Sequence, residues 1–472
     1  MNKFYITTPI YYSNDRPHAG TIYTSIAADV LARFYRAKGD KVYFQTGVDE
    51  HGAKMAKAAQ AAGFSDVQKF CDSRVNYFKK PLQSLNITYD NFIRTTDKKH
   101  ETYVKNFLTK LYKKGEIYQG VYKGLYCIGC EEFKNKSDLV GGKCPLHQSK
   151  PEKIEEKNYF FKLSKYQKKL IELIEKNHLK VEPVERKNEI LGFLRKQKLQ
   201  DISISREKVE WGVILPWDKK QTIYCWIDAL LNYLSGGENC WPADLHLIGR
   251  DILKFHAVIW PALLIASGYK PPKKIFAHGF FTLEGKKISK TLGNIVYADD
   301  LIKKYQPDVV RYFLLRAIPF GKDGDFSEEL LIKRYNSDLA NDLGNLIKRT
   351  EAMAVKYFDG NIIKLSKAEK DLSNFDITGI WQKVEEDIVN LHFDAALAII
   401  WQLISTTNKY IDKEKPWQNE KNRAKVLANL IGVIREIGQL ILPFLPHTSL
   451  MIEKRFSGTK INLEKALFLR KK

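Results

Sequence analysis

The sequence lacks any apolar run of the length that crosses a membrane, which for a helix is about 20 residues. Its strand-like start, Phe4–Thr8, leaves no length for a signal or transit peptide. Only six cysteines occur in 472 residues, too few for a disulfide framework and typical of a reducing compartment. These absences exclude a membrane-spanning protein and predict a cytoplasmic one.

Two common phosphate-binding signatures are also missing. The chain has no GxxxxGK(S/T) loop and no GxGxxG after a strand-like run, which excludes P-loop and ordinary dinucleotide-binding proteins. Basic residues, by contrast, are abundant: 77 lysines and arginines against 55 acidic residues give a net charge of +22. Such an excess favours a polyanionic partner, most often nucleic acid, although a lysine-rich composition bias explains it equally well.

The first third of the chain alternates strand-like and helical segments. A strand at Phe4–Thr8 is expected to end at Pro9, and a second strand, Lys41–Thr46, follows the first helix. The order strand, helix, strand, helix implies a doubly wound parallel sheet, in which ligands collect beyond the carboxyl ends of the strands. We therefore expect the loops that carry His18 and Asp49 to meet in one crevice.

Residues 118–150 are turn-rich and contain four closely spaced metal-ligand side chains. Cys127 and Cys130 form a CxxC pair, and Cys144 and His147 form a CxxH pair thirteen residues further on. This spacing is typical of tetrahedral zinc, and four protein ligands leave no open position, so a structural site is predicted. Chance placement of reduced cysteines is the alternative.

The α/β pattern resumes after this insertion with QTIYCWIDALLNYLSG. Trp226, Ala229, Leu230 and Tyr233 recur there at helical spacing and form one helix face, which by itself is more typical of core. The stretch DLHLIGRDILKFH then predicts a strand, Leu245–Gly249, with a polar loop and a helix after it. This loop is expected to face the same crevice.

A lysine-rich loop follows the next predicted strand, Lys274–His278. In FFTLEGKKISKTLGN, Lys286, Lys287 and Lys290 surround a serine between two glycines. Close cations repel one another unless they share an anion, so a triphosphate is the natural partner of this loop. A solvated basic loop is the plainer alternative.

The sequence is helical in character from Asp299 to the end. Long amphipathic runs cover Glu328–Phe358, Phe393–Asp412 and Asn422–Phe444. A helical bundle appended to the α/β core is the simplest interpretation.

Two distant stretches, PHAGT near the start and KISKT past the middle, together resemble the HIGH and KMSKS motifs of class I aminoacyl-tRNA synthetases. The finer pattern is similar to the methionyl-tRNA synthetase branch of that family, in the form with a single zinc knuckle. It runs through essentially the whole chain as TTPIYYSNDRPHAGT, TGVDEHGAK, YCIGC…CPLH, YCWIDALLNY, HLIGRDILKFH, KKISKTLGN, NDLGNLIKR and KPW.

The resemblance implies ATP-dependent activation of L-methionine to methionyl-adenylate and its transfer to the 3′ end of tRNA(Met). It also implies one structural Zn2+, Mg2+ with ATP, and a monomer, because a C-terminal dimerising module of longer relatives is missing here. One alternative is a class I synthetase for another amino acid, against which Tyr12, Trp226, Tyr233 and the lack of a large editing-type insertion count. The other is a noncatalytic zinc-bearing tRNA-binding protein, which would not need intact KISKT and DEHG loops.

The resemblance also assigns roles to matching positions. Catalytic roles fall to His18, Lys287 and Lys290. ATP binding is assigned to these three together with Gly20, Thr21, Gly249 and Asp251. The methionine pocket would be lined by Pro9, Ile10, Tyr12, Asp49, Trp226, Ala229, Leu230, Tyr233, Ile252 and His256. Anticodon reading would fall to Asn345, Arg349, Pro416 and Trp417, of which the first two look like ordinary bundle surface without the resemblance.

The expected architecture is a doubly wound, Rossmann-like catalytic domain with a zinc-bearing insertion, followed by an all-α bundle. Its expected segments are 1–117 for the first catalytic half, 118–220 for the insertion with the zinc knuckle, 221–297 for the second catalytic half, 298–340 for a linking helical region with contacts on the KISKT side, and 341–472 for the anticodon-binding bundle.

Thr21 departs from the family, whose members commonly carry a second histidine there. Threonine keeps a hydrogen-bond donor but has no imidazolium charge to offer phosphates. We therefore expect Thr21→His to leave ATP–pyrophosphate exchange equal or faster. A large loss of exchange would show instead that threonine is tuned to this site. Two milder departures are Ile288 and Thr291, in place of Met and Ser in KMSKS.

Overall fold

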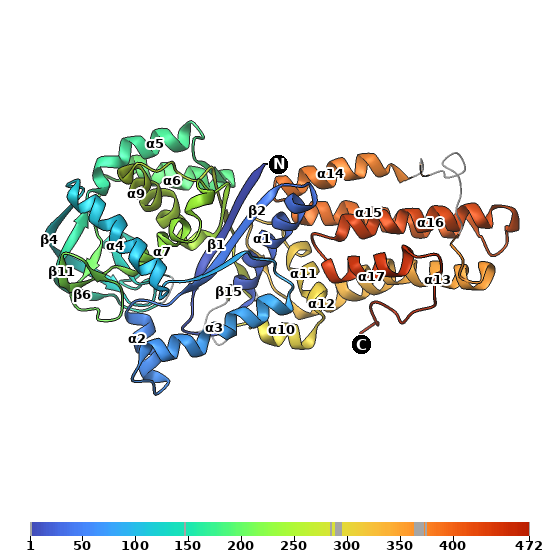
Figure 1. Ribbon diagram of the computed structural model, residues 1–472, viewed down its shortest axis with the longest axis horizontal. Coiled ribbons are helices and arrows are strands. Elements are labelled where there is room, and N and C mark those ends of the chain that lie inside the picture. Colours follow the sequence, from blue (N-terminus) through green and yellow to red (C-terminus); the bar gives the residue numbers. More distant parts are fainter. Residues whose placement is uncertain are drawn as a thin grey trace.

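The computed structural model describes residues 2–145, 148–283, 286–287, 295–362, 372 and 375–471. The molecule is elongated, with an α/β part at one end and a helical bundle at the other (Figure 1). In this described part of the chain, no helix is both long and apolar enough to cross a membrane.

A parallel sheet forms the centre of the α/β part. Its strands have the order β3-β2-β1-β12-β13-β7, and each neighbouring pair is parallel. The strand order reverses at β1, and parallel sheets open a ligand crevice at such a point. The predicted doubly wound sheet is therefore confirmed. Its two halves contain β1 (Lys3–Tyr12), α1 (Ala19–Ala37), β2 (Lys41–Asp49), α2 (Ala53–Ala61), α3 (Val67–Ser84), β3 (Asn91–Arg94) and α4 (Lys98–Lys113), then α7 (Cys225–Leu230), α8 (Asn232–Ser235), β12 (Leu245–Gly249), α9 (Trp260–Ser267) and β13 (Lys274–His278).

Strand β1 continues past Pro9 to Tyr12, so the prediction that it ends at Pro9 is wrong. Its register against β2 shifts between Thr7 and Ile10. Proline has no N–H to contribute to a strand ladder and is tolerated where the pairing is interrupted. The register shift therefore accommodates Pro9, and the strand carries its last residues into the crevice.

Helix α1 is buried on nearly all sides against the sheet. Ile22, Ile26 and Leu31 are at most 1% exposed, and the polar Ser25 and Asp29 are fully buried as well, so the helix belongs to the core. The helix begins at His18, whose ring accepts a hydrogen bond from the backbone N–H of Gly20 at 3.1 Å. The core of the sheet thus fixes the position of His18.

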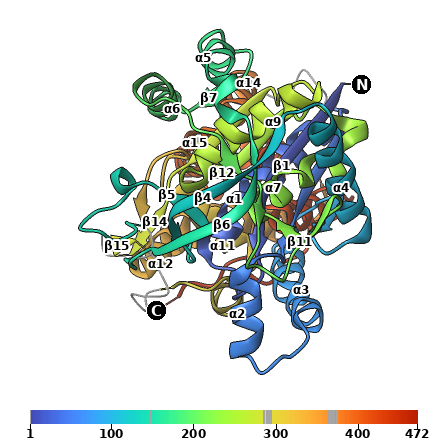
Figure 2. The same cartoon turned by 90° about the vertical axis from the view of Figure 1, so that its left-hand side faces the viewer.

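The segment between the two halves forms sheets of its own, with strand orders β5-β4-β6-β8 and β10-β11-β9, seen from the end of the molecule in Figure 2. One strand, β7, instead pairs in parallel with β13 at the edge of the main sheet. The sequence does not predict β7, because its three residues, KVE, carry no strand pattern. The elements of this segment are β4 (Ile117–Cys127), β5 (Glu132–Lys134), β6 (Glu152–Phe161), α5 (Gln167–Glu175), β7 (Lys180–Glu182), α6 (Val184–Lys196), β8 (Ile202–Ser203), β9 (Ser205–Arg206), β10 (Ile214–Leu215) and β11 (Asp218–Ile223).

The bundle follows a short connecting region. The connecting elements are β14 (Phe281–Leu283), β15 (Lys286–Lys287), α10 (Ala298–Lys304), α11 (Pro307–Arg316) and β16 (Gly324–Asp325). The bundle helices are α12 (Glu328–Arg334), the π-helical η7 (Tyr335–Gly344), α13 (Asn345–Phe358), α14 (Ile377–Val389), α15 (Phe393–Glu414), α16 (Glu420–Ile441) and α17 (Pro446–Phe456). The long helices run side by side along the molecule (Figure 1), as the amphipathic runs predict.

The run predicted at Glu328–Phe358 is continuous but has a π-helical middle, η7. A π-helical segment loosens the regular backbone ladder. Two of its carbonyl groups accept side-chain hydrogen bonds from α15: Asp338 from Trp401 at 3.0 Å, and Asp342 from Asn408 at 3.1 Å. The neighbouring helix thus stabilises the irregular turn.

A buried ion pair joins the α/β part to the bundle. The guanidinium of Arg311 in α11 lies 2.8 Å from the carboxylate of Asp29 in α1, and both side chains are 0% exposed. Arg311 also donates hydrogen bonds to the carbonyls of Phe444 at 2.7 Å, Pro443 at 2.8 Å and Leu85 at 3.1 Å. All these acceptors together compensate the cost of burying a cation.

We expect Arg311→Ala to lower the free energy of unfolding by about 3 kcal/mol, because it leaves Asp29 and three carbonyl groups buried with fewer partners. Lys38→Ala is the matched control. It removes a partly exposed pair with Glu385 of α14 that also joins α1 to the bundle, and it should cost less than about 1 kcal/mol. Urea unfolding of both variants measures the difference. Equal losses would contradict the role of the buried pair.

Candidate functional site

A pocket opens where the strand order reverses, beyond the carboxyl ends of β1 and β2. Every residue assigned to the methionine pocket by the sequence lines it, and Asn232 is added by the structure. The pocket has a volume of about 310 Å³, including its open mouth. The full lining is Pro9, Ile10, Tyr12, Asp49, Trp226, Ala229, Leu230, Asn232, Tyr233, Ile252 and His256.

Aromatic rings form one wall of this pocket. Trp226 stacks on Phe255 with ring centres 3.9 Å apart and planes 11° apart. Tyr12 meets the face of Trp226 edge-on, at 6.3 Å and 90°. Such rings offer a polarizable, apolar surface that suits a hydrocarbon or thioether chain.

His256 and Tyr233 add a fixed polar group to the pocket. The Nδ1 atom of His256 lies 2.9 Å from the carbonyl oxygen of Ile252, which can only accept, so this nitrogen carries the proton. The Nε2 atom therefore accepts from the hydroxyl of Tyr233 at 2.7 Å. Burial lowers the pKa of His256 to about 4, so the imidazole is neutral at physiological pH.

Asp49 is the anionic group of the pocket. It is the last residue of β2 and is 3% exposed. Burial raises the pKa of its carboxyl well above the usual value, and the nearby carboxylates of Asp228 and Glu131 raise it further, against a backbone hydrogen bond from His51. A buried carboxyl with two anionic neighbours is stabilised by a cationic ligand, and an ammonium group is the natural one.

A second buried network lies behind Asp49, and the sequence pattern does not reveal it. The two carboxylate oxygens of Asp228 contact His51 Nδ1 at 2.7 Å and His100 Nε2 at 3.0 Å, and His100 Nδ1 contacts Ser235 at 2.7 Å. Burial alone would raise the pKa of Asp228, but the two imidazoles lower it to about 2. Asp228 follows two residues after Trp226, on another face of the helix, where the apolar pattern gives no signal.

His18 is the residue immediately before α1, on the segment that follows β1. Its side chain is exposed, and its Nδ1 accepts the N–H of Gly20, so the neutral ring carries its proton on Nε2. A Cβ atom at position 20 would lie 3.0 Å from the imidazole ring, which explains the glycine. Thr21, by contrast, is only 7% exposed, so His18 and Gly20 are accessible at the start of α1 while the Thr21 side chain is buried.

Gly249 and Asp251 lie at the carboxyl end of β12. Gly249 ends the strand, and Asp251 lies exposed in the 3-10 turn Arg250–Ile252. A Cβ atom at position 249 would come within 2.7 Å of the Asp251 carboxylate, so only glycine leaves that carboxylate in place. Lys287 is placed by its backbone in β15, paired with Thr282, while Lys290 lies outside the described residues.

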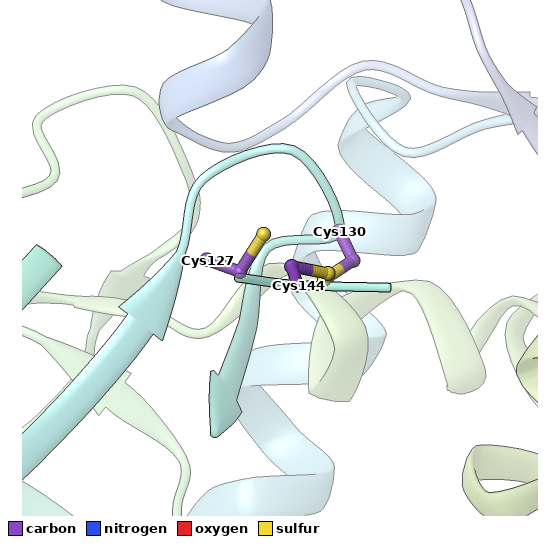
Figure 3. A group of neighbouring side chains, drawn as sticks. All are labelled: Cys127, Cys130 and Cys144. Carbon is purple, nitrogen blue, oxygen red and sulfur yellow. The ribbon is translucent and has the colours of Figure 1, made fainter. Parts of the chain in front are cut away.

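Three cysteines meet on the loop between β4 and β5 and the segment after it (Figure 3). The sulfur atoms of Cys127, Cys130 and Cys144 all lie within 4.8 Å of one another, and those of Cys130 and Cys144 are 3.9 Å apart. Two zinc–sulfur bonds of about 2.3 Å at a tetrahedral angle put sulfurs about 3.8 Å apart. The three thiols therefore fit a metal such as zinc. The fourth predicted ligand, His147, lies outside the described residues.

The proposed anticodon residues lie on α13 and in the turn between α15 and α16. Arg349 of α13 pairs with Asp412 of α15 at 2.5 Å, and its guanidinium lies 6.0 Å from the ring of Trp417 in the turn before α16. Asn345 and Trp417 are exposed, whereas Pro416 is buried. Three of the four side chains thus reach the surface there, and Pro416 shapes the turn.

Known proteins match this chain along most of its length. The family model described as tRNA synthetases class I (M) matches residues 4–151 and 134–351. A methionine–tRNA ligase of Caldanaerobacter subterraneus is 47% identical over 464 residues, which cover 94% of this chain and 72% of that protein. One from Thermotoga maritima is 45% identical over 482 residues, covering 96% and 75%. The chain belongs to the class I tRNA synthetases of the methionine type.

Solved structures of this synthetase family agree with the fold. The methionyl-tRNA synthetase of Mycobacterium tuberculosis in complex with methionyl-adenylate matches with a TM-score of 0.93 at 36% identity, over the whole of both chains. The free form of the same enzyme matches with a TM-score of 0.83, at 33% identity. The synthetase fold described here is thus more similar to the adenylate-bound relative.

Proposed function

We propose that this protein activates L-methionine with ATP to methionyl-adenylate and transfers the methionyl group to the 3′ end of tRNA(Met). The pocket carries this proposal. It combines aromatic walls, a neutral His256 that is hydrogen-bonded to Tyr233, and a buried Asp49 whose ionised form a cationic ligand would stabilise. The relatives named as methionine–tRNA ligases support the same activity.

Each part of methionine has a counterpart in the pocket. The ammonium pairs with Asp49, because a buried carboxylate and an ammonium form a charge-assisted hydrogen bond. The thioether chain packs against Trp226 and Tyr12, since sulfur contacts aromatic rings favourably. The Tyr233–His256 pair closes the pocket with its polar atoms already bonded to each other, so it presents a surface with little affinity for a charged side chain.

Activation would be a direct displacement at phosphorus. A carboxylate oxygen of methionine forms a bond to the α-phosphorus of Mg2+-bound ATP, the bond from that phosphorus to the bridging oxygen breaks, and pyrophosphate leaves with the electron pair. His18, Lys287 and Lys290 would stabilise the negative charge that develops on the phosphates, while Gly20, Gly249 and Asp251 would hold the nucleotide. Positioning and electrostatics supply the catalysis, so no protein nucleophile is required.

Transfer would follow in the same crevice. The oxygen of the terminal ribose hydroxyl of the tRNA forms a bond to the methionyl carbonyl carbon, the bond from that carbon to the phosphate oxygen breaks, and AMP leaves with the electron pair while the hydroxyl proton is released. The bundle would hold the anticodon, where Asn345 and Arg349 can hydrogen-bond splayed base edges and the exposed ring of Trp417 can stack on a base. The net charge of +22 suits the tRNA backbone.

The cysteine cluster would hold structural zinc with His147 as the fourth ligand. Bound zinc would fix the turns between β4 and β6, which have little apolar core of their own. Three expectations from the sequence stay predictions: the division of the chain into five segments, the monomeric state and the cytoplasmic location.

ATP–pyrophosphate exchange with a panel of amino acids tests the proposal. Methionine is expected to support exchange at least about a hundredfold better than cysteine, leucine or valine, because a buried polar contact and a shaped apolar wall both discriminate. Exchange with a different amino acid would identify the first alternative, another class I synthetase. No exchange with any amino acid would identify the noncatalytic tRNA-binding protein.

Methionine affinity should depend on pH through Asp49. The ammonium pairs only with ionised Asp49, and the pKa of this carboxyl is raised, so affinity is complete above that pKa and falls up to about tenfold per pH unit below it. Titration calorimetry with methionine alone, between about pH 5 and 8, measures the effect. Asp49→Asn should bind weakly and without this pH dependence. A flat profile in the unchanged protein would contradict the pairing.

A further inference from the structure

Residues 128–131 connect β4 to β5 and are called the cysteine loop below. Glu131 in this loop has a fully buried carboxylate. It directly follows Cys130 and is 0% exposed, whereas Glu132 beside it is partly exposed and pairs with Lys134. Its backbone has a φ of 49°, in the left-handed region that residues other than glycine rarely adopt. Such a conformation persists only where its surroundings hold it.

The carboxylate of Glu131 caps helix α2, which follows the loop of Asp49. Its Oε1 atom accepts the backbone N–H of Lys54 at 2.9 Å. Its Oε2 atom accepts from the thiol of Cys225 at 3.3 Å, in the first turn of α7. A Cβ atom at Gly52 would come within 2.5 Å of Oε1. Glycine at position 52 therefore lets the loop between β2 and α2 close over this carboxylate.

Backbone carbonyls of the cysteine loop make further bonds to the same two elements. The hydroxyl of Tyr224 donates to the carbonyl of Glu131 at 2.5 Å, and the indole of Trp226 donates to that of Cys130 at 3.1 Å. The ammonium of Lys54 donates to the carbonyl of Gly129 at 3.3 Å. Consecutive residues of one loop thus bind both the start of α2 and the start of α7.

These two elements carry much of the methionine pocket. Trp226 is a pocket wall, and the ammonium of Lys54 lies 4.5 Å above the ring of Tyr12, a second wall. Asp49 precedes the capped helix by four residues. Glu131 itself does not line the pocket but lies behind it. A shift of this one side chain would therefore move three groups that face methionine.

We propose that Glu131 is a positioning residue for methionine, acting through the start of α2 on Asp49 and Tyr12 and through the start of α7 on Trp226. This inference rests on the proposed function. The proposed role needs a side-chain oxygen at residue 131 that can accept the N–H of Lys54. Glutamine has such an oxygen and should preserve the role, whereas glycine and alanine lack it and should not.

The test compares Glu131→Gly, Glu131→Ala and Glu131→Gln in ATP–pyrophosphate exchange. Glycine suits a φ of 49° and protects the fold, so Glu131→Gly separates loss of the carboxylate from backbone strain. Glu132→Ala is the matched control, because it removes the adjacent carboxylate of the same loop. KM for methionine, KM for ATP, the zinc content of the purified protein and its unfolding temperature are measured for each variant.

We expect Glu131→Gly and Glu131→Ala to raise KM for methionine at least about tenfold, the usual cost of leaving a buried donor unpaired. KM for ATP should stay within about twofold, and zinc content should not change. The Glu131 side chain contacts neither the residues proposed to bind ATP nor the thiols of the three clustered cysteines. Glu131→Gln should stay within about threefold of the unchanged protein in KM for methionine, and Glu132→Ala should match the unchanged protein.

Two results would overturn the inference: an unchanged KM for methionine in folded, zinc-loaded Glu131→Gly, or an equal effect on both substrates accompanied by loss of zinc. The second result would assign Glu131 to holding the loop together rather than to positioning methionine. Failure of the proposed function looks different, because then neither the unchanged protein nor Glu132→Ala shows methionine-dependent exchange.

Discussion

The pair of Asp29 and Arg311 holds the molecule together across its long axis. Asp29 lies in α1, the helix that begins at His18, and Arg311 lies in α11, which leads into the bundle. Because Arg311 also binds the carbonyls at the end of α16, one guanidinium fixes the first helix of the sheet relative to the last long helix of the bundle. Burial of this pair resists movement of the bundle relative to the sheet, since a displaced arginine would leave charge and carbonyl groups unpaired in a dry interior.

The pocket proposed for methionine has the opposite electrostatic character, because no lysine or arginine among the described residues contributes to the environment of Asp49. Asp49 is buried near two further carboxylates, and Asp228 has its own partners in His51 and His100. The surroundings therefore store unfavourable energy around Asp49 that an incoming ammonium relieves. Burial also keeps the imidazole of His256 neutral, so the pocket holds no positive charge from this residue. Burial, which lowers the pKa of His256 and raises that of Asp49, thus prepares the site for a zwitterionic amino acid.

Much of this could be predicted from the sequence, because the informative residues follow strands in a regular order. The carboxyl ends of β1 and β2 and the turn after β12 all lie at one edge of a parallel sheet, so Tyr12, Asp49 and Ile252 meet although they are far apart in the chain. Other features depend on tertiary geometry that no local pattern records. Pro9 stays within its strand because the register shifts beside it, and Glu131 looks like an ordinary acidic turn residue until the burial and backbone angle are known.

The loop that carries Cys130 lies beside the pocket proposed for methionine, and it contacts the starts of α2 and α7 there. Its position depends on hydrogen bonds to two helices: Gly129 accepts from Lys54 of α2, and Cys130 and Glu131 accept from residues at the start of α7. With zinc bound by the three nearby thiols, as proposed, and with Trp226 and Lys54 on its other side, the loop would have little freedom to relax. The same contacts would then limit the movement of the pocket walls Trp226 and Tyr12. In the proposed function, these walls discriminate a thioether from hydrocarbon chains of similar size. Since a missing methylene alone gives only about 10- to 200-fold discrimination, walls that cannot move make the shape of the pocket itself part of the selection.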